Sequence, residues 1–566
     1  MSSIVILLIS IVVLCGAYLT YGKYLAKAWG VGDKETTPAH ELEDGVDYMP
    51  AKAPVLMGHH FASIAGAGPI NGPIQASPFG WLPVLLWILI GGVFFGAVHD
   101  FGSLFASVRH DAKSIGHVIE VNIGKTGKRL FLVFGWLTLL LVIAAFASIV
   151  QGTFTVTPDQ AAAGDFSNGS VATASLLFIV LAIAFGFLVY RKNAPLGVSS
   201  IIGVVLLAIC IWVGLAAPIS GVSGNIWLIF ILVYIIIACV APVWILLQPR
   251  DYLNSFLLYA MMLLAVVGVV FANPKMEIPA FTNWLGTVGD KSMGPMFPVL
   301  FITVACGAIS GFHSLVGSGT SSKQLDKETD IKAIGYGAML VECLLATLSL
   351  IAVGALGAQQ GTPPQTFAIG ISGFFGMLGA SAGVVATIKT LLLLAVSAFA
   401  LTSLDTAARM GRFLFQEFFI NEGEDAKSIT GFRKFLINPY VATIITVGLG
   451  GLLAVGGYTK VWPLFGAANQ LLAGLSLLAV CVWLGRIGKK NGMFYVPMTF
   501  MLVATITSLI ITLKNQITNI VTATGDMTSS VLQVIFAVLL VVLALFLVIE
   551  GIKALANINK KKAAAA

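Results

Sequence analysis

The sequence predicts an all-α polytopic membrane protein with about 15 transmembrane helices. Only 10% of the 566 residues are charged, 58% are hydrophobic and the mean hydropathy is +0.96, whereas soluble domains carry about 25% charged residues. The apolar residues fall in runs of about 17–25, the length of a helix that crosses a ~30 Å hydrocarbon layer. Basic residues gather between alternate runs. Lipid is therefore the expected solvent for most of the chain.

The expected membrane spans follow one another along the chain, joined by short polar segments. They are 3–26, 57–78, 81–108, 128–151, 172–190, 196–217, 225–247, 253–272, 297–316, 332–357, 384–403, 436–457, 463–485, 494–513 and 530–552. No long polar stretch separates them, so we expect no soluble domain. The first span has no basic residue before it and no A-x-A site, which favours a transmembrane helix over a signal peptide.

The loop charges predict the orientation of the chain. Of the 32 basic residues, 27 lie in loops on one side of the predicted spans, four lie on the other side, and Lys389 lies within a span. Cytoplasmic loops are the ones enriched in Lys and Arg, so we expect a periplasmic N-terminus and a cytoplasmic C-terminus. The net charge of +7 fits this asymmetry and suggests no nucleic-acid partner.

Two of the predicted spans are poor helices. Both Gly58–Pro73 and Cys306–Thr320 are rich in glycine, and the first also contains two prolines. Glycine costs about 1 kcal/mol and proline about 3 kcal/mol in a helix interior. Unwound backbone is tolerated at membrane depth only where it is buried in protein or lines a wet cavity. We therefore expect the backbone to unwind near Gly66–Gly72 and Gly307–Gly319.

The two broken spans predict an inverted repeat, because the loop charges orient them in opposite directions. The expected divisions are an N-terminal helix and loop, two repeats that each start with a broken helix, and a cytoplasmic tail: 1–56, 57–272, 273–552 and 553–566. Each broken span is followed by a helix with a carboxylate, Asp100 or Glu342. Interrupted helices at matching positions of inverted halves indicate a transporter binding site. The alternative is that the glycines only permit close helix packing.

The candidate substrate-binding residues lie around the two breaks. Unwound backbone exposes amide groups, and the positive ends of half-helices attract a carboxylate; hydroxyl, amide and imidazole groups would add hydrogen bonds. The candidates are His59, His60, Ser63, Gly66, Gly68, Asn71, Gly72, Gln75, Gly307, Ser310, His313, Ser314, Gly317, Asn469 and Gln470. Asn469 and Gln470 have an alternative role, which is to hydrogen-bond a neighbouring helix.

The candidate proton-coupling residues are the ionisable groups expected inside the membrane: His99, Asp100, Glu342 and Lys389. Each costs about 2.5–3.5 kcal/mol at the helix centre, so each requires a reason, and histidine titrates near neutral pH. Glu342 and Lys389 could instead pair with each other, and Asp100 with His99 could be an interfacial charge. Asp405 and Arg409 are spaced as an i,i+4 helical ion pair.

The sequence offers little for a metal, a cofactor or an enzyme. His59 and His60 are adjacent and point about 100° apart on a helix, with no H-x-x-x-H pattern beside them. The six cysteines lie in apolar spans without paired metal spacing and are expected to be small buried hydrophobes. No G-x-x-x-x-G-K-[ST] loop and no nucleophile–base constellation is present. We therefore expect no cofactor and no enzymatic activity.

Several long strings resemble the carbon starvation protein A (CstA) family. They are Gly58–Pro73, Val98-His99-Asp100-Phe101, Gln248-Pro249-Arg250-Asp251-Tyr252 and Trp462–Gln470. The resemblance runs from about residue 3 to 515, and the chain is shorter than the longest members, mostly toward its C-terminus. It implies a bacterial inner-membrane importer of peptides or, in some members, pyruvate, driven by protons. It also implies a LeuT-like core of five-plus-five inverted helices with the first of each five broken.

Together these observations predict a secondary active transporter that works by alternating access, a symporter of protons with a peptide or a small carboxylate such as pyruvate. Its expected partners are that substrate, protons and the lipid bilayer; the choice of substrate and the oligomeric state stay open. The competing hypotheses are a carboxylate channel, which would not need inverted halves, and a membrane nutrient sensor without transport. A sensor would need an output domain, and the longest inside loop, 404–435, is small for one.

Overall fold

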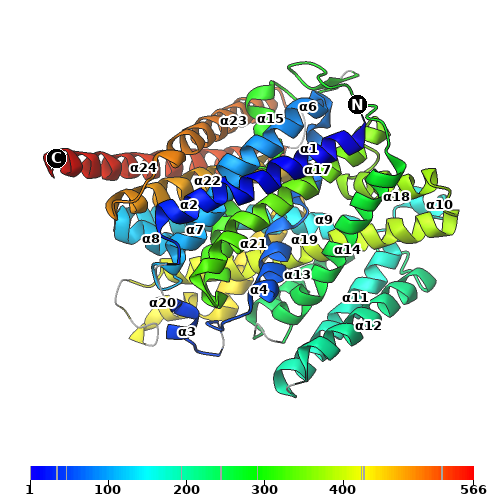
Figure 1. The fold of residues 1–566 in the computed structure, drawn as a ribbon, viewed down its shortest axis with the longest axis horizontal. Helices are drawn as coiled ribbons and strands as arrows, with labels where there is room; N and C mark the ends of the chain where they lie inside the picture. Colours follow the sequence, from blue (N-terminus) through cyan, green and yellow to red (C-terminus); the bar gives the residue numbers. More distant parts are fainter. Residues whose placement is uncertain are drawn as a thin grey trace.

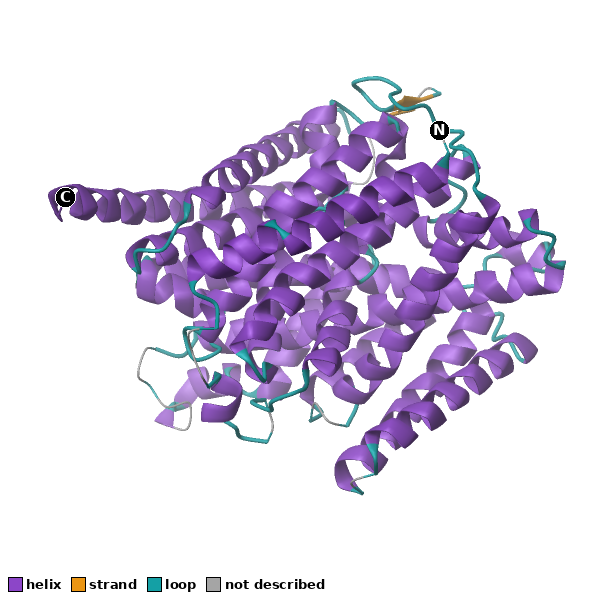
Figure 2. Ribbon diagram, in the orientation of Figure 1, coloured by secondary structure: helices purple, strands orange, loops and turns teal. Residues whose placement is uncertain are grey.

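A computed structural model describes residues 2–32, 36–45, 47–192, 194–242, 245–289, 291–421, 424, 428–523 and 527–565. These residues are almost entirely helical, with one two-stranded hairpin formed by β1 (Thr287–Val288) and β2 (Lys291–Ser292) (Figure 2). The hairpin formed by α11 and α12 lies at one edge of the helix bundle, and α23 and α24 lie at the opposite edge (Figure 1). Two of the basic loop residues counted above, Lys34 and Lys427, lie outside the described residues.

Eleven helical segments in the described part of the chain are long and apolar enough to cross a membrane. They contain α1 (Ser3–Leu19) with α2 (Tyr21–Trp29), α6 (Trp81–Leu86) with α7 (Ala97–Val108), α9 (Lys125–Phe154), α11 (Ser167–Gly186), α12 (Leu196–Ala216), α14 (Leu247–Ala272), α17 (Ala338–Leu356), α19 (Ala382–Phe418), α22 (Tyr458–Arg486), α23 (Tyr495–Val521) and α24 (Met527–Ala565). Two shorter apolar helices are α13 (Gly224–Val240) and α21 (Pro439–Ala454). The all-helical class is confirmed, while the number of crossings stays a prediction.

Burial separates the central helices from the peripheral ones. In an apolar stretch of 18 residues within the segment that contains α22, 100% of the residues are buried. The corresponding share is only 17% for α12 and 22% for α24. The exposed side chains of α12 are themselves apolar, including Ile201 and Trp212. A helix with this surface is stable where its surroundings are lipid, so α12 and α24 lie at the periphery and α22 in the core.

The first predicted break is present and is narrower than expected. Helix α4 (Ala53–Ala65) ends at Gly66, and α5 (Gly68–Ala76) begins two residues later. Gly66 has φ +44°, and a Cβ there would lie 2.7 Å from the Oγ of Ser403, so only glycine fits. The expectation that the backbone unwinds through Gly72 is wrong, because the helix resumes at Gly68, with Pro69 in its first turn.

The second predicted break is longer, and it lies before most of the glycines. Helix α15 (Met296–Thr303) is followed by non-helical backbone over 304–310, and α16 (Gly311–Gly319) follows. Gly307 lies within the break as expected. The segment from Gly311 to Gly319 is helical rather than unwound. Both glycine clusters therefore accompany a broken helix, but each break occupies only part of its cluster.

The two breaks face each other across the interior. A Cβ on Gly68 would lie 2.4 Å from the Cβ of Cys306, and one on Gly72 would lie 2.9 Å from the carbonyl oxygen of Thr303. From the other side, a Cβ on Gly307 would lie 3.7 Å from the Cα of Pro69. Helix α5 thus lies directly against residues 303–307, and the glycines permit this approach.

The helices that follow the two breaks share a further feature. The segment after α5 contains π-helical turns at Trp87–Gly96, and the segment after α16 contains π-helical turns at Lys332–Gly337. π-Helical turns are rare in proteins overall, and those that occur are often found at functional sites. Each segment then continues into an α-helix that bears a buried carboxylate, Asp100 on α7 or Glu342 on α17.

Several helices were not expected from the sequence. The longest is α18 (Pro363–Met377), between predicted spans 332–357 and 384–403. The shorter ones are α3 (Pro38–Glu41), α8 (Ile115–Asn122), α10 (Pro158–Ala162) and α20 (Gly431–Leu436). Thr362 and Gln365 form a capping box at the start of α18, a signal present in the sequence. A search for membrane spans overlooks these helices because they are only 4–15 residues long.

Candidate functional site

His313 lies between two buried carboxylates that come from different helices. Its Nδ1 is 2.7 Å from Oδ2 of Asp100 on α7, and its Nε2 is 3.4 Å from Oε2 of Glu342 on α17. The three residues are 1%, 3% and 0% exposed, respectively. His313 is the third residue of α16, so the helix that follows the second break places its imidazole between the two carboxylates.

A second imidazole completes this cluster. His99 Nδ1 lies 2.7 Å from the other carboxylate oxygen of Asp100, Oδ1, and His99 is fully buried. Among the described residues, neither carboxylate oxygen of Glu342 has a hydrogen-bond partner, nor does Nε2 of His99. We call His99, Asp100, His313 and Glu342 the central cluster. Two carboxylates and two imidazoles in one buried cluster can hold a variable number of protons, which suits a coupling site.

The N-terminus of α16 is already capped by a side chain. Asn469 on α22 accepts a hydrogen bond from the backbone N–H of Phe312 (2.8 Å) through Oδ1, and its Nδ2 donates to the Oγ of Ser310 (3.1 Å). Asn469 therefore acts as an N-cap supplied by another helix. Of the two roles considered for Asn469, the structure shows the hydrogen bond to a neighbouring helix. Gln470 likewise donates to a carbonyl, that of Phe301 (2.6 Å).

The other candidate residues near the second break are held by contacts within the protein. Ser314 donates to the carbonyl of Gly311 (2.7 Å) and lies 2.8 Å from the hydroxyl of Ser476. Gly317 faces Leu104, with 3.8 Å between a Cβ placed on it and the Leu104 Cβ. The polar groups of the second break thus hold α16 in place.

The first break has more unsatisfied polar groups. Within the described part of the structure, the Ser63 hydroxyl and both amide atoms of Asn71 have no hydrogen-bond partner, although both residues are fully buried. Buried polar groups are ordinarily paired with protein or water. The two side chains flank the Gly66–Ala67 break, on α4 and α5. They therefore have hydrogen-bonding capacity left for a ligand beside this break, while Gln75 lies further along α5, half-buried.

His59 and His60 are held in two separate contacts. His59 Nδ1 lies 3.1 Å from Oδ2 of Asp251 on α14, and His60 Nδ1 lies 2.7 Å from the hydroxyl of Ser321. The second contact joins α4 to η4 (Ser321–Gln324), the turn that follows α16. In the described part of the chain, no three His, Cys, Asp or Glu side chains are arranged so that they could hold a metal ion.

A second buried ionic network adjoins His59, and sequence reasoning missed it. Arg250 donates to Asp251 (3.1 Å) and to Asp405, and the Tyr234 hydroxyl donates to Asp405 (3.2 Å). Arg250 lies between predicted spans 225–247 and 253–272 and so belongs to an expected loop, yet it is 1% exposed on α14. The string Gln248–Tyr252 was noted only for its resemblance to the family. Its two adjacent opposite charges at a span end were the available signal.

Neither of the two ion pairs considered from the sequence is present among the described residues. Asp405 pairs with Arg250 instead of Arg409, which donates to the carbonyls of Ala238 (2.9 Å) and Ala241 (2.8 Å) at the end of α13. Ala238 belongs to the last turn of α13 and Ala241 is its C-cap, where backbone acceptors lack intrahelical partners.

Lys389 also has a different partner from the one considered. It pairs with Asp165 at 2.7 Å, not with Glu342, and its side chain is 23% exposed. Burial acts to raise the pKa of Asp165, but hydrogen bonds from Lys389 and Ser167 outweigh it and hold the pKa below its usual range. The contact joins α19 to the segment before α11. Lys389 therefore forms an ion pair with Asp165, and among the described residues no ion pair joins it to the central cluster.

Comparison with known proteins relates the chain to membrane transporters. It matches the family model described as carbon starvation protein CstA over residues 2–362 and 357–508. It is 34% identical over 534 residues to the peptide transporter CstA of Bacillus subtilis (strain 168), covering 87% of each chain. It is 31% identical over 591 residues to the pyruvate/proton symporter BtsT of Escherichia coli (strain K12), covering 89% of this chain and 81% of that protein.

The fold also resembles that of a solved transporter. A crystal structure of the Eremococcus coleocola manganese transporter aligns with a TM-score of 0.51 and 11% sequence identity, covering 91% of this chain and 99% of that one. At this identity the likeness concerns the fold alone. The fold is LeuT-like, and the relatives found by sequence are named as transporters rather than enzymes.

Proposed function

The chain belongs to the carbon starvation protein CstA family, and from this premise we propose that it is a secondary active transporter coupled to protons. The substrate is a peptide or a small carboxylate such as pyruvate, imported across the bacterial inner membrane by alternating access. The names of the relatives, a peptide transporter and a pyruvate/proton symporter, support both substrate classes. Each of these substrates has a carboxylate.

The proposal rests on one observation, the contact of His313 with both Asp100 and Glu342. Asp100 belongs to the segment after the first break, while His313 and Glu342 belong to the second break and the segment after it. Movement of one half against the other would change the Asp100–His313 distance. The number of protons on the central cluster and the relative position of the two halves are then linked, which is what coupling requires.

The substrate site lies at the facing breaks. Ser63 and Asn71 provide buried hydrogen-bonding groups beside Gly66, and residues 303–307 lie against α5. The matching π-helical turns after each break support an inverted repeat with this site at its centre. With Asn469 capping α16, the first break is the better place for the substrate carboxylate.

Uptake into proteoliposomes tests the function. Labelled pyruvate, dipeptides and tripeptides are supplied with and without an imposed proton gradient. One proton moving through 100 mV is worth about 2.3 kcal/mol, enough for roughly 50-fold accumulation. We expect saturable uptake of one substrate class, stimulation by the gradient, and counterflow. Flux without saturation or counterflow would indicate a channel, and specific binding without flux would indicate a sensor.

A further inference from the structure

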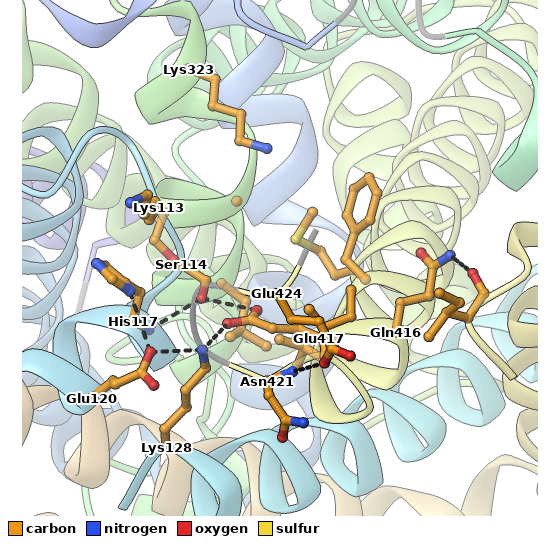
Figure 3. A pocket seen from close by; sticks show the side chains of 18 of the residues that line it. Lys113, Ser114, His117, Glu120, Lys128, Lys323, Gln416, Glu417, Asn421 and Glu424 are labelled. Carbon is orange, nitrogen blue, oxygen red and sulfur yellow. Dashed lines mark hydrogen bonds and ion pairs between the residues drawn. The ribbon is translucent and has the colours of Figure 1, made fainter. Parts of the chain in front are cut away.

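A cavity of about 780 Å³ opens beyond the C-terminal end of α16. Its walls include residues of α8 and α9, of α16 and the turn η4 that follows it, and of α19, which lies further along the chain (Figure 3). The lysines around it belong to the loops with most of the basic residues, which places it on the expected cytoplasmic side. The volume is ample for pyruvate or a short peptide.

Two lysines of this cavity differ in how their charge is compensated. Lys128 is neutralised by Glu120 (2.7 Å) and Glu417 (3.2 Å). The ammonium of Lys323 instead lies 5.3 Å from the ring centroid of Tyr48 and 5.7 Å from that of Phe413. Among the described residues, no carboxylate forms an ion pair with Lys323, and its side chain extends into the cavity in Figure 3.

Aromatic rings and an uncompensated ammonium form a good site for a carboxylate. The rings attract the cation and hold it in place, while a charge-assisted hydrogen bond to an incoming carboxylate remains to be made. Tyr48 is itself fixed, because its hydroxyl donates to the carbonyl of Asp111 (3.0 Å). Lys323 is therefore held facing the cavity without being neutralised there.

The cavity also adjoins the helix that contains the central cluster. Leu315, Ser318 and Gly319 of α16 line it, and α16 bears His313 near its other end. A Cβ on Gly319 would lie 2.3 Å from the sulfur of Met410 on α19. This contact closes α16 against α19 at the wall of the cavity, so displacement of α16 would change both the cavity and the surroundings of His313.

We propose that this cavity is a cytoplasmic substrate-binding site, in which Lys323 binds the carboxylate of the departing peptide or pyruvate. The inference rests on the proposed transport function and adds the exit site and its recognition group. The substrate leaves the central breaks when α16 separates from Met410, and it is then held by Lys323 before release. Lys323 consequently determines affinity at the cytoplasmic face and has no role at the outer face.

Transport kinetics at each membrane face test the inference. In vesicles of known orientation, Lys323→Gln should raise the half-saturation concentration of pyruvate or dipeptide at the cytoplasmic face about tenfold, equivalent to ~1.4 kcal/mol. The value at the outer face should stay within about twofold, and Lys323→Arg should retain most of the cytoplasmic affinity. Lys327→Gln is the matched control, because Lys327 is exposed on the same segment and does not line the cavity. Equal effects at both faces, or none at the cytoplasmic face, would overturn the inference.

A labelling experiment separates this inference from the transport proposal. Ser114 lines the cavity, and Ser114→Cys introduces a thiol of similar size there. We expect pyruvate or a dipeptide to slow modification of that thiol by a membrane-impermeant maleimide, and Lys323→Gln to abolish the protection. The unsubstituted protein gives the background of the native cysteines. Protection without transport would refute the proposed function alone, whereas transport without protection would refute the cavity site.

Discussion

The Nδ1 atom of His313 lies 2.7 Å from the Oδ2 atom of Asp100, so a residue on the half-helix after the second break touches a carboxylate on the helix after the first. Both side chains are buried. The same imidazole lies 3.4 Å from Glu342 through its other nitrogen. One side chain thus connects the two segments that, in the proposed mechanism, move against each other.

Removal of either partner of this contact should be strongly destabilising. Asp100→Asn and His313→Gln should each lower the free energy of unfolding by about 3–5 kcal/mol, because each leaves an uncompensated buried group. The double variant should lose clearly less than the sum of the two. Chemical unfolding in detergent, run on all four proteins of the cycle, gives the coupling energy. Strict additivity would show that the two residues do not interact.

Asn469 should stabilise the start of α16. Asn469→Ala removes the acceptor for the Phe312 N–H and should cost about 1 kcal/mol, the usual effect of losing an N-cap. Asn469→Asp keeps that acceptor and should recover most of the stability. The midpoint of thermal unfolding measures both variants. If Asn469→Ala unfolds at the wild-type temperature, the cap does not contribute.

The close approach of the two breaks predicts a rescue. Gly68→Ala places a Cβ 2.4 Å from the Cβ of Cys306, so it should reduce stability and transport. Adding Cys306→Gly removes the obstructing atoms, and its Cα would lie 3.8 Å away, so the double variant should recover. Gly16→Ala is the control, because nothing lies within 4 Å of a Cβ there. A double variant as impaired as Gly68→Ala would disprove this packing.

The Lys389–Asp165 pair should affect stability only and not coupling. A lowered pKa means that the Asp165 carboxylate stabilises the fold at pH values above the ordinary carboxyl pKa of 3.8, and this contribution is lost as pH falls through the lower folded value. Since the pair is partly exposed, the contribution at neutral pH is roughly 0.2–1 kcal/mol. Lys389→Gln should lose that amount and keep its response to a proton gradient. Loss of the gradient response would return Lys389 to the coupling site.

The breaks could be predicted from the sequence because glycine and proline act locally on helix stability. Their exact extent could not, because the resumption of helix at Gly68 and Gly311 depends on contacts with Cys306 and with the backbone of α22. Local spacing likewise suggested that Asp405 pairs with Arg409. The structure has Arg250 there instead, since Arg409 satisfies carbonyls at the end of α13. Such choices are made by tertiary contacts.

The central cluster shows the same limit. Asp100, His313 and Glu342 could each be singled out as ionisable groups inside membrane spans. Their assembly could not be predicted, because Asp100 and His313 are separated by 213 positions. No sequence pattern pointed to the cavity near Lys323, since its walls come from five separate segments.

In the proposed mechanism, the transported proton binds the cluster of Asp100, His313 and Glu342. The decisive measurement is the pH inside proteoliposomes when substrate is added outside with no imposed gradient. We expect the wild-type protein to acidify the lumen as substrate enters, and Glu342→Gln to exchange labelled for unlabelled substrate without acidification. Glu277→Gln is the control, because Glu277 is exposed outside the described helices. Undiminished acidification by Glu342→Gln would show that Glu342 does not bind the transported proton.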